Sequence, residues 1–351
     1  MLEPRYTKVP SDSVKAQLDE AVEALCTEIG DLRLPKLASV VLGGGYGRGE
    51  GGVCRTSRGD RLYNDLDFFV FSDGANHDEM HQIATELSRI TAKWERRLGV
   101  SVDMSPIKEL SSLSRVSCKL MYQELVRGWI PIWGSVDLEK FILRRPPEAL
   151  PFSEAARLIL NRGMGLIFAG ERLAEGSRDA DFIMRNLHKS QLGAGDALLI
   201  AAGKYRWNGA ERLEVLRRYL AENGLSSGIG DNYEKALVYK AEPVPVLPDD
   251  PRAVWLDCRK CFLEAARHVA GCAPDASARA VARGMHRRAA SERSLRNFLR
   301  RVLRCGPFRP FSAIFDPPEV TVAGKLFALL NAGEAYPVCT PTLHRLWVNF
   351  N

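Results

Sequence analysis

A glycine-rich segment directly after an apolar run places the strongest constraint on the N-terminal part of the chain. Seven of the residues in VVLGGGYGRGEGGV (40–53) are glycine, and the run LASVVLG reads as a buried strand. Glycine lets the backbone approach a ligand closely and adopt conformations that other residues avoid. The segment therefore predicts a strand that ends in a loop suited to phosphate.

The spacing of apolar residues predicts a sheet with helices around it. Helices are expected over 12–30, 77–98 and near 117–127, and strands in DLDFFVF, GVSVDMSPI and WIPIWG. Beyond residue 145 the pattern is helical over 153–170, 181–206 and 210–223. The predicted fold class is α+β, with an N-terminal α/β domain built on a mixed sheet and an all-α C-terminal domain.

The predicted division has three parts: a sheet domain over 1–145, a helical domain over 146–241, and a further helical region over 242–351 packing on it. The third part opens with EPVPVLPDDP (242–251), whose four prolines favour a linker or an extended crossing.

The composition predicts a folded protein without a membrane segment. Hydrophobic residues make up 46% of the 351 residues and charged residues 26%, as in ordinary globular chains. The sequence contains no long apolar run, and the N-terminus lacks the apolar core of a signal peptide. The eight scattered cysteines favour reduced thiols and a cytoplasmic location. The net charge of +6 gives a mild preference for anionic partners.

Two aspartates begin the strand after the glycine-rich segment. Asp65 and Asp67 stand at positions i and i+2, so they project from one face of a strand about 7 Å apart. A divalent cation offsets the repulsion of such a pair, and hard oxygen ligands suit Mg²⁺. Asp103, in VSVDMS, is expected on a neighbouring strand. Three acids on two strands can hold two metal ions.

A dinucleotide-binding crossover is the main alternative for this region. GRGEGG (47–52) matches G-x-G-x-x-G, and Asp67 follows at the appropriate distance. The intervening VCRTSRGDRLYN is too short and too polar for a crossover helix. The two aspartates also stand at the start of their strand rather than at its end, which disfavours this interpretation.

The glycine loop and the acids together resemble the DNA polymerase β-like nucleotidyltransferase superfamily. LGGGYGRGE is similar to its glycine loop, and NDLDFFVF and SVDMS match its acidic motifs in order. This resemblance covers roughly residues 35–135. LILNRGMGLI and RNLHKSQLGAGDALLIAAGKY, within 150–225, resemble the helical domain of bacterial members such as the aminoglycoside nucleotidyltransferases.

The resemblance implies a nucleotidyltransferase that uses Mg²⁺ or Mn²⁺ and an NTP. Asp65, Asp67 and Asp103 would hold the metals, with Asp103 as general base. Gly44 and Gly45 would offer backbone N–H groups to phosphates at the start of a helix.

Further contacts are expected from side chains outside these motifs. Arg48 would add a charged donor near the phosphates. Lys189, Lys204 and Tyr205, in the helical domain, would contact a nucleotide lying between the domains. The acceptor hydroxyl stays open among a small molecule, an RNA end and a protein side chain.

Two other functions remain open. A catalytically weak module of the same fold would bind nucleotide or a partner for regulation, and a dinucleotide oxidoreductase is the third interpretation. Gly45 stands where the family commonly has serine. Gly51 and Gly52 are expected at a glycine-rich helix start, and Glu50 is either a helix N-terminal carboxylate or a surface residue.

Three further patterns favour ordinary helices over functional sites. HDEMH (77–81) imitates a zinc helix but has aspartate in place of glutamate. CRKC (258–261) fits an amphipathic helix with buried cysteines better than a zinc site. Ten arginines lie within 279–309. Nucleic-acid binding by this region is possible, but solvated arginines are favoured.

Overall fold

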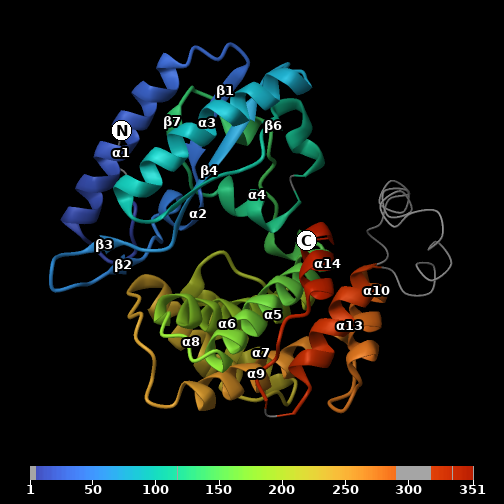
Figure 1. Cartoon of the computed structure of the whole chain (residues 1–351). Helices are drawn as coiled ribbons and strands as arrows, with labels where there is room; N and C mark the ends of the chain where they lie inside the picture. Colours follow the sequence, from blue (N-terminus) through green and yellow to red (C-terminus); the bar gives the residue numbers. More distant parts are fainter. Residues whose placement is uncertain (1–4, 117, 290–317, 334, 351) are drawn as a thin grey trace. The chain divides into compact units, whose positions relative to one another are not determined.

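The computed structural model describes residues 5–116, 118–289, 318–333 and 335–350 (Figure 1). The chain forms two compact units. The first contains the chain up to Pro146 together with Val238–Val244, and the second contains Pro147–Leu237 and the chain from Pro245 onward. The segment 238–244 therefore belongs to the sheet-containing unit, although it begins inside a helix, Gly228–Ala241.

The first unit holds the sheet. Its elements are α1 (Asp12–Asp31), β1 (Leu37–Leu42), α2 (Gly44–Gly47), β2 (Val53–Cys54), β3 (Arg61–Leu62), β4 (Asp65–Ser72), α3 (His77–Leu98), β5 (Ser101–Met104), β6 (Lys108–Glu109), α4 (Leu120–Leu125) and β7 (Ile130–Trp133). Helix α1 begins directly after Ser11, whose side chain caps it by accepting the N–H of Val14 at 3.3 Å. The small β2–β3 hairpin and β6 were not predicted.

The main sheet is mixed, in the order β5–β4–β1–β7, with β6 also paired to β4. Strand β1 runs antiparallel to β4 and to β7, whereas β5 and β6 run parallel to β4. A dinucleotide-binding crossover between β1 and β4 would require these two strands to be parallel. Their antiparallel pairing excludes that interpretation of the glycine loop.

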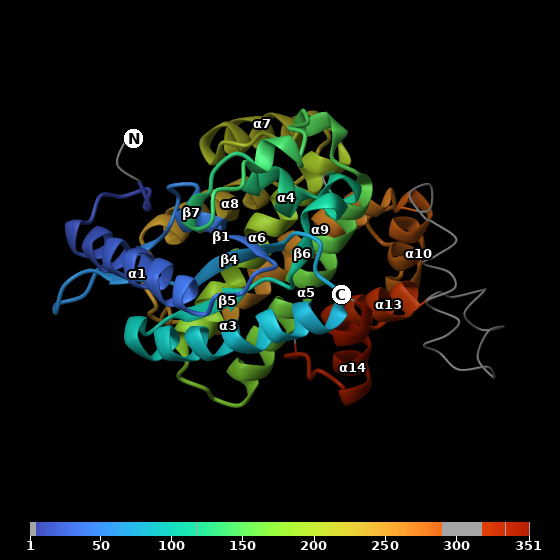
Figure 2. The same cartoon turned by 90° about the horizontal axis from the view of Figure 1, so that it is seen from above.

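Alternating residues of the strands face two separate cores. Val40, Leu42, Phe68 and Val70 pack with α1 and α3 in one core. Residues of the opposite parity, Val41, Phe69 and Phe71, pack with the α4 region in the other core. Figure 2 shows α3 and α4 on opposite sides of the strands. Because Asp65 and Asp67 share the parity of Phe69, their side chains belong to the α4 face.

The described residues of the second unit form helices joined by loops, without strands. Its helices are α5 (Phe152–Ala174), α6 (Ala180–Ala201), α7 (Gly209–Glu222), α8 (Gly228–Ala241, whose end belongs to the first unit), α9 (Pro251–Ala270), α10 (Ala278–Ala289), α13 (Pro318–Leu330) and α14 (Pro341–Phe350). Helix α5 packs along α6, and α9 contacts both. The indole N–H of the buried Trp255 donates to the C=O of Leu166 at 2.9 Å, which fastens α9 to α5.

The CRKC segment lies within α9, as the amphipathic pattern predicted. Cys258 and Cys261 are buried, and burial raises the pKa of Cys261 to about 11. Both thiols therefore contribute to the core as small apolar groups. Among the helices of the described ranges, none combines the length and apolarity needed to cross a lipid bilayer.

A partly buried histidine, His188, makes the stability of the second unit pH-dependent. Burial, helped by the positive charge of Lys235, lowers the pKa of His188 to about 4. Between about pH 6.5 and pH 4, His188 is protonated in the unfolded chain but neutral in the folded chain. The free energy of unfolding should therefore decrease as the pH is lowered through this range. We expect this contribution to amount to about 1.4 kcal/mol per pH unit in that window.

Urea titrations of the wild type and of His188→Gln from pH 7.5 to 4 would measure this contribution as a difference in slope. The matched control is His77→Gln, because the His77 side chain is fully exposed. A slope that is the same in the wild type and in His188→Gln would contradict the prediction.

Candidate metal centre

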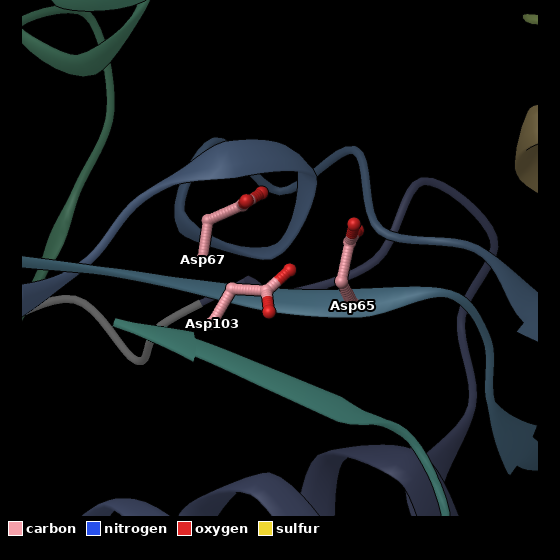
Figure 3. A group of neighbouring side chains, drawn as sticks. All are labelled: Asp65, Asp67 and Asp103. Carbon is pink, nitrogen blue, oxygen red and sulfur yellow. The ribbon is translucent and has the colours of Figure 1, made fainter. Parts of the chain in front are cut away.

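Three aspartates from two neighbouring strands come together on one face of the sheet. In the parallel pairing of β4 with β5, Asp67 lies opposite Asp103, and Asp65 lies two residues before Asp67. One carboxylate oxygen of each residue lies within 4.8 Å of the other two. Figure 3 shows the three side chains projecting from the same side of β4 and β5. The neighbouring strand expected for Asp103 is therefore β5.

The position of the cluster follows from the sequence of β4. Along DLDFFVF the residues of one parity are Asp65, Asp67, Phe69 and Phe71, so one face of a single strand changes from acidic to apolar. Phe69 and Phe71 are buried in the core beside α4, whereas Asp65 and Asp67 are partly exposed at the start of the strand. The apolar half of the strand anchors the acidic half at the edge of that core.

Each carboxylate has different surroundings. The side-chain amide of Asn64, a residue with a positive φ of 71°, donates to Asp65 Oδ1. Ser101 Oγ donates to Asp103 Oδ1 at 3.0 Å. Asp103 is exposed, whereas the other two aspartates are partly covered. The cluster therefore combines accessible oxygen ligands with polar neighbours that hold individual carboxylates.

The glycine loop lies directly against Asp67. The N–H of Gly43 donates to the backbone C=O of Asp67 at 2.8 Å. Gly44 has a φ of +59°, and a Cβ at this position would overlap the Asp67 carboxylate. Only glycine combines this backbone conformation with the close approach. The predicted loop and the predicted acids are thus parts of one arrangement.

The prediction that a helix starts at Gly51 and Gly52 is wrong. Helix α2 is a single turn over Gly44–Gly47, and Gly52 leads into the strand β2. A Cβ at Gly51 would overlap the ring of Tyr46, so glycine there makes room for an aromatic side chain. Because α2 is so short, a helix dipole contributes little to the predicted phosphate site.

Tyr46 organises the loop, and no sequence pattern marked it. Its buried hydroxyl lies 2.7 Å from the C=O of Gly52 and accepts the N–H of Tyr63 at 2.8 Å. Burial raises its pKa well above the ordinary value, with a smaller contribution from the negative charge of Asp65. The phenol is therefore neutral and joins the glycine loop to the residues just before β4.

Arg48, predicted as a phosphate donor, has carboxylates beside it. Its guanidinium lies 3.5 Å from Glu50 and 3.4 Å from Glu124. Glu50 also accepts from Lys240 at 2.9 Å. Glu50 follows α2 instead of opening a helix, so its role as a helix N-terminal carboxylate is wrong. A nearby hydrogen bond, Tyr63 Oη to Tyr239 Oη at 2.9 Å, also joins the segment 238–244 to this region.

The candidate residues of the helical domain all lie in the second unit. Lys204 is paired with Glu222 at 3.0 Å. Tyr205 is fully buried, and its hydroxyl accepts from Arg212 at 2.7 Å, so it serves the core and is inaccessible to a ligand. Lys189 lies partly buried on α6. The aspartates belong to the first unit.

The arginine-rich region is described only in part. Arg279 and Arg283 lie on α10, together with Arg287 and Arg288. Arg288 donates to the C=O of Val269 at 2.6 Å and therefore has a structural contact. The remainder of the predicted nucleic-acid region, 290–309, lies outside the described residues.

A scan against protein-family models and a search of curated proteins both find no match to this chain.

Proposed function

We propose that this chain is a metal-dependent nucleotidyltransferase of the DNA polymerase β-like type. It would transfer an NMP from an NTP to a hydroxyl acceptor and release pyrophosphate. The observation that carries this proposal is the meeting of three carboxylates within 4.8 Å beside the glycine loop. Neither feature alone indicates the reaction, because acidic clusters and glycine turns are common separately.

The residues fit a divalent cation. Carboxylate oxygens are the hard ligands that Mg²⁺ and Mn²⁺ prefer. Asp65, Asp67 and Asp103 offer such oxygens close to one another and accessible to solvent. When bound, the cation would offset the negative charge of the carboxylates and of a triphosphate, and would activate an acceptor oxygen.

The chain's own residues supply the remaining chemistry. Asp103, exposed on the edge strand, would take the proton from the acceptor hydroxyl. The acceptor oxygen would form a bond to the α-phosphorus as the bond from that phosphorus to its bridging oxygen breaks. The electron pair of that bond leaves with pyrophosphate. Catalysis would depend mainly on positioning and on charge stabilisation.

The glycine loop supports the phosphate-binding part of the proposal. Gly44 and Gly45 carry no side chain, and among the described residues outside the turn itself, no heavy atom lies closer than 3.6 Å to a Cβ position at Gly45. Phosphate oxygens could therefore approach the backbone N–H groups of this turn. Arg48 would exchange a carboxylate neighbour for phosphate when an NTP binds.

Label transfer tests the proposal directly. The purified full chain is incubated with each of the four α-³²P ribonucleoside triphosphates, Mg²⁺ or Mn²⁺, and host lysate as the acceptor pool. We expect metal-dependent label in one fraction, either small molecules, RNA or protein, and we expect Asp65→Asn/Asp67→Asn to abolish it. The matched control is Asp73→Asn, because this exposed aspartate follows β4 outside the cluster.

The outcomes separate the two remaining functions. Label that persists in the double variant would contradict the proposal. Metal-dependent NTP binding without any transfer would instead support the regulatory binding module.

A further inference from the structure

The edge strand β5 brings a hydroxyl group to the carboxylates. Ser101 lies opposite Asp65 in the β4–β5 register, as Asp103 lies opposite Asp67. Residues two apart on a strand share a face, so Ser101 projects from the same face as Asp103. Its Oγ donates to Asp103 Oδ1 at 3.0 Å.

The hydrogen bond from Ser101 is the contact that restrains the Asp103 side chain. Asp103 is the exposed member of the cluster and lies on an edge strand. Within the described part of the chain, Ser101 is its hydrogen-bond partner, and no other donor reaches it. An exposed aspartate side chain samples several rotamers, and a single charge-assisted hydrogen bond favours one of them.

Glu95 of α3 offers a second carboxylate to the Ser101 hydroxyl. Glu95 Oε1 accepts the N–H of Val102 at 3.1 Å and lies 3.3 Å from Ser101 Oγ. A serine hydroxyl has one proton, so it can donate to only one of the two carboxylates at a time. The distance to Asp103, 3.0 Å, is shorter than the 3.3 Å to Glu95, so Asp103 is the favoured acceptor.

The connection between α3 and β5 keeps Ser101 in place. Helix α3 ends at Leu98, and Gly99 follows in the left-handed conformation with a φ of 68°. Strand β5 begins two residues later, at Ser101. The bond from Val102 to Glu95 ties this start of the strand back to the last turn of α3. Ser101 therefore lies in a short connection that is fastened to α3 at Gly99 and at Val102, both of which donate to Glu95.

We propose that Ser101 is a positioning residue of the metal centre, which orients the Asp103 carboxylate toward Asp65 and Asp67. The inference rests on the proposed function, and it adds a residue that no motif identified. A carboxylate offers about four acceptor positions. The serine hydroxyl occupies one of them, and Oδ2 stays available to a cation.

Metal affinity gives the sharpest test. Mn²⁺ alone is titrated calorimetrically into the full-length wild type, Ser101→Ala, Ser101→Thr and Ser105→Ala. We expect Ser101→Ala to weaken Mn²⁺ binding by about tenfold, as loss of a group that orients a metal ligand commonly does. Ser101→Thr keeps the hydroxyl on a β-branched residue suited to a strand, so it should bind as the wild type does.

Ser105 is the matched control. Its Oγ accepts the N–H of Val70 at 3.3 Å, so it contacts the same strand pair without touching the carboxylates. Ser105→Ala should leave Mn²⁺ affinity unchanged. In label transfer, Ser101→Ala should lower kcat with little change in the KM for NTP, because the substitution leaves the phosphate-binding loop intact. Thermal unfolding without metal checks that all variants fold.

The outcomes distinguish this inference from the proposed function. Equal Mn²⁺ affinity in the wild type and Ser101→Ala would overturn the role of Ser101 alone. Weakened binding in Ser101→Thr equal to that in Ser101→Ala would also overturn it, because the hydroxyl would not be the determinant. An absence of saturable Mn²⁺ binding in the wild type would overturn both proposals.

Discussion

Replacing Asp67 with asparagine is expected to reduce nucleotide transfer by about a thousandfold, equivalent to about 4 kcal/mol of transition-state stabilisation. Asp67 lies opposite Asp103 and against Gly44. Asparagine has the same shape but removes the negative charge, which weakens the hold on a divalent cation. Initial rates at saturating NTP and increasing Mg²⁺ would measure the loss.

The Asp67→Asn variant should retain its fold, because the substitution is nearly isosteric. Circular dichroism and the midpoint of thermal unfolding check this. Part of the activity should return at high Mn²⁺ if the defect lies in metal affinity. A variant that folds normally and transfers at the wild-type rate would refute the assignment of Asp67.

Substituting Gly44 with alanine should damage both stability and activity. The left-handed backbone at this position costs a non-glycine residue about 1–2 kcal/mol. The new Cβ would also overlap the Asp67 carboxylate, so the carboxylate or the loop must move. Displacements of about 1 Å near a reacting centre can cost about a hundredfold in rate, and we expect a loss of this size. Urea unfolding and label transfer measure the two effects.

Gly45→Ala is a comparison within the same turn. Gly45 has no positive φ, and among the described residues outside the turn, the nearest heavy atom to its Cβ position is 3.6 Å away. We expect the free energy of unfolding to stay within about 0.5 kcal/mol of the wild type. A methyl group there would still hinder phosphate, so the KM for NTP should rise. Equal destabilisation of the two alanine variants would show that the special geometry of Gly44 is unimportant.

The sheet and the acidic cluster could be predicted because strong local patterns determine them. The alternation in β4 places Asp65 and Asp67 on one face, and the apolar stripe of α3 predicts its full length. The third acid of the cluster, Asp103, lies far from Asp65 and Asp67 in the sequence, so local patterns do not determine its position. That Asp103 lies on the neighbouring strand was an expectation from chain order, and the exact register with Asp67 comes from the structure.

The details of the glycine loop could not be predicted for a physical reason. Glycine permits a helix start, a tight turn and a close approach equally well, so its presence does not select one of them. The choice depends on which side chain fills the vacated space. At Gly51 that side chain is Tyr46, and at Gly44 it is Asp67.

The helical candidates show a second limit of sequence patterns. Lys204 and Tyr205 are adjacent in sequence, and both were expected to face a ligand. The structure places Lys204 at the surface with Glu222, whereas Tyr205 lies in the core and bonds to Arg212. Burial of a tyrosine is decided by packing among several helices, which the local sequence does not reveal.

The return of the chain at 238–244 has a consequence for how the protein can be divided. A fragment that stops at Pro146 would contain all three aspartates. It would lack three hydrogen bonds to the segment 238–244: Glu50 with Lys240, Tyr63 with Tyr239, and Arg55 with Glu242. The sheet-containing unit is discontinuous along the gene. Recombination that exchanges the helical unit for another would therefore need two crossover points, one on each side of the inserted helices, to keep the sheet-containing unit whole.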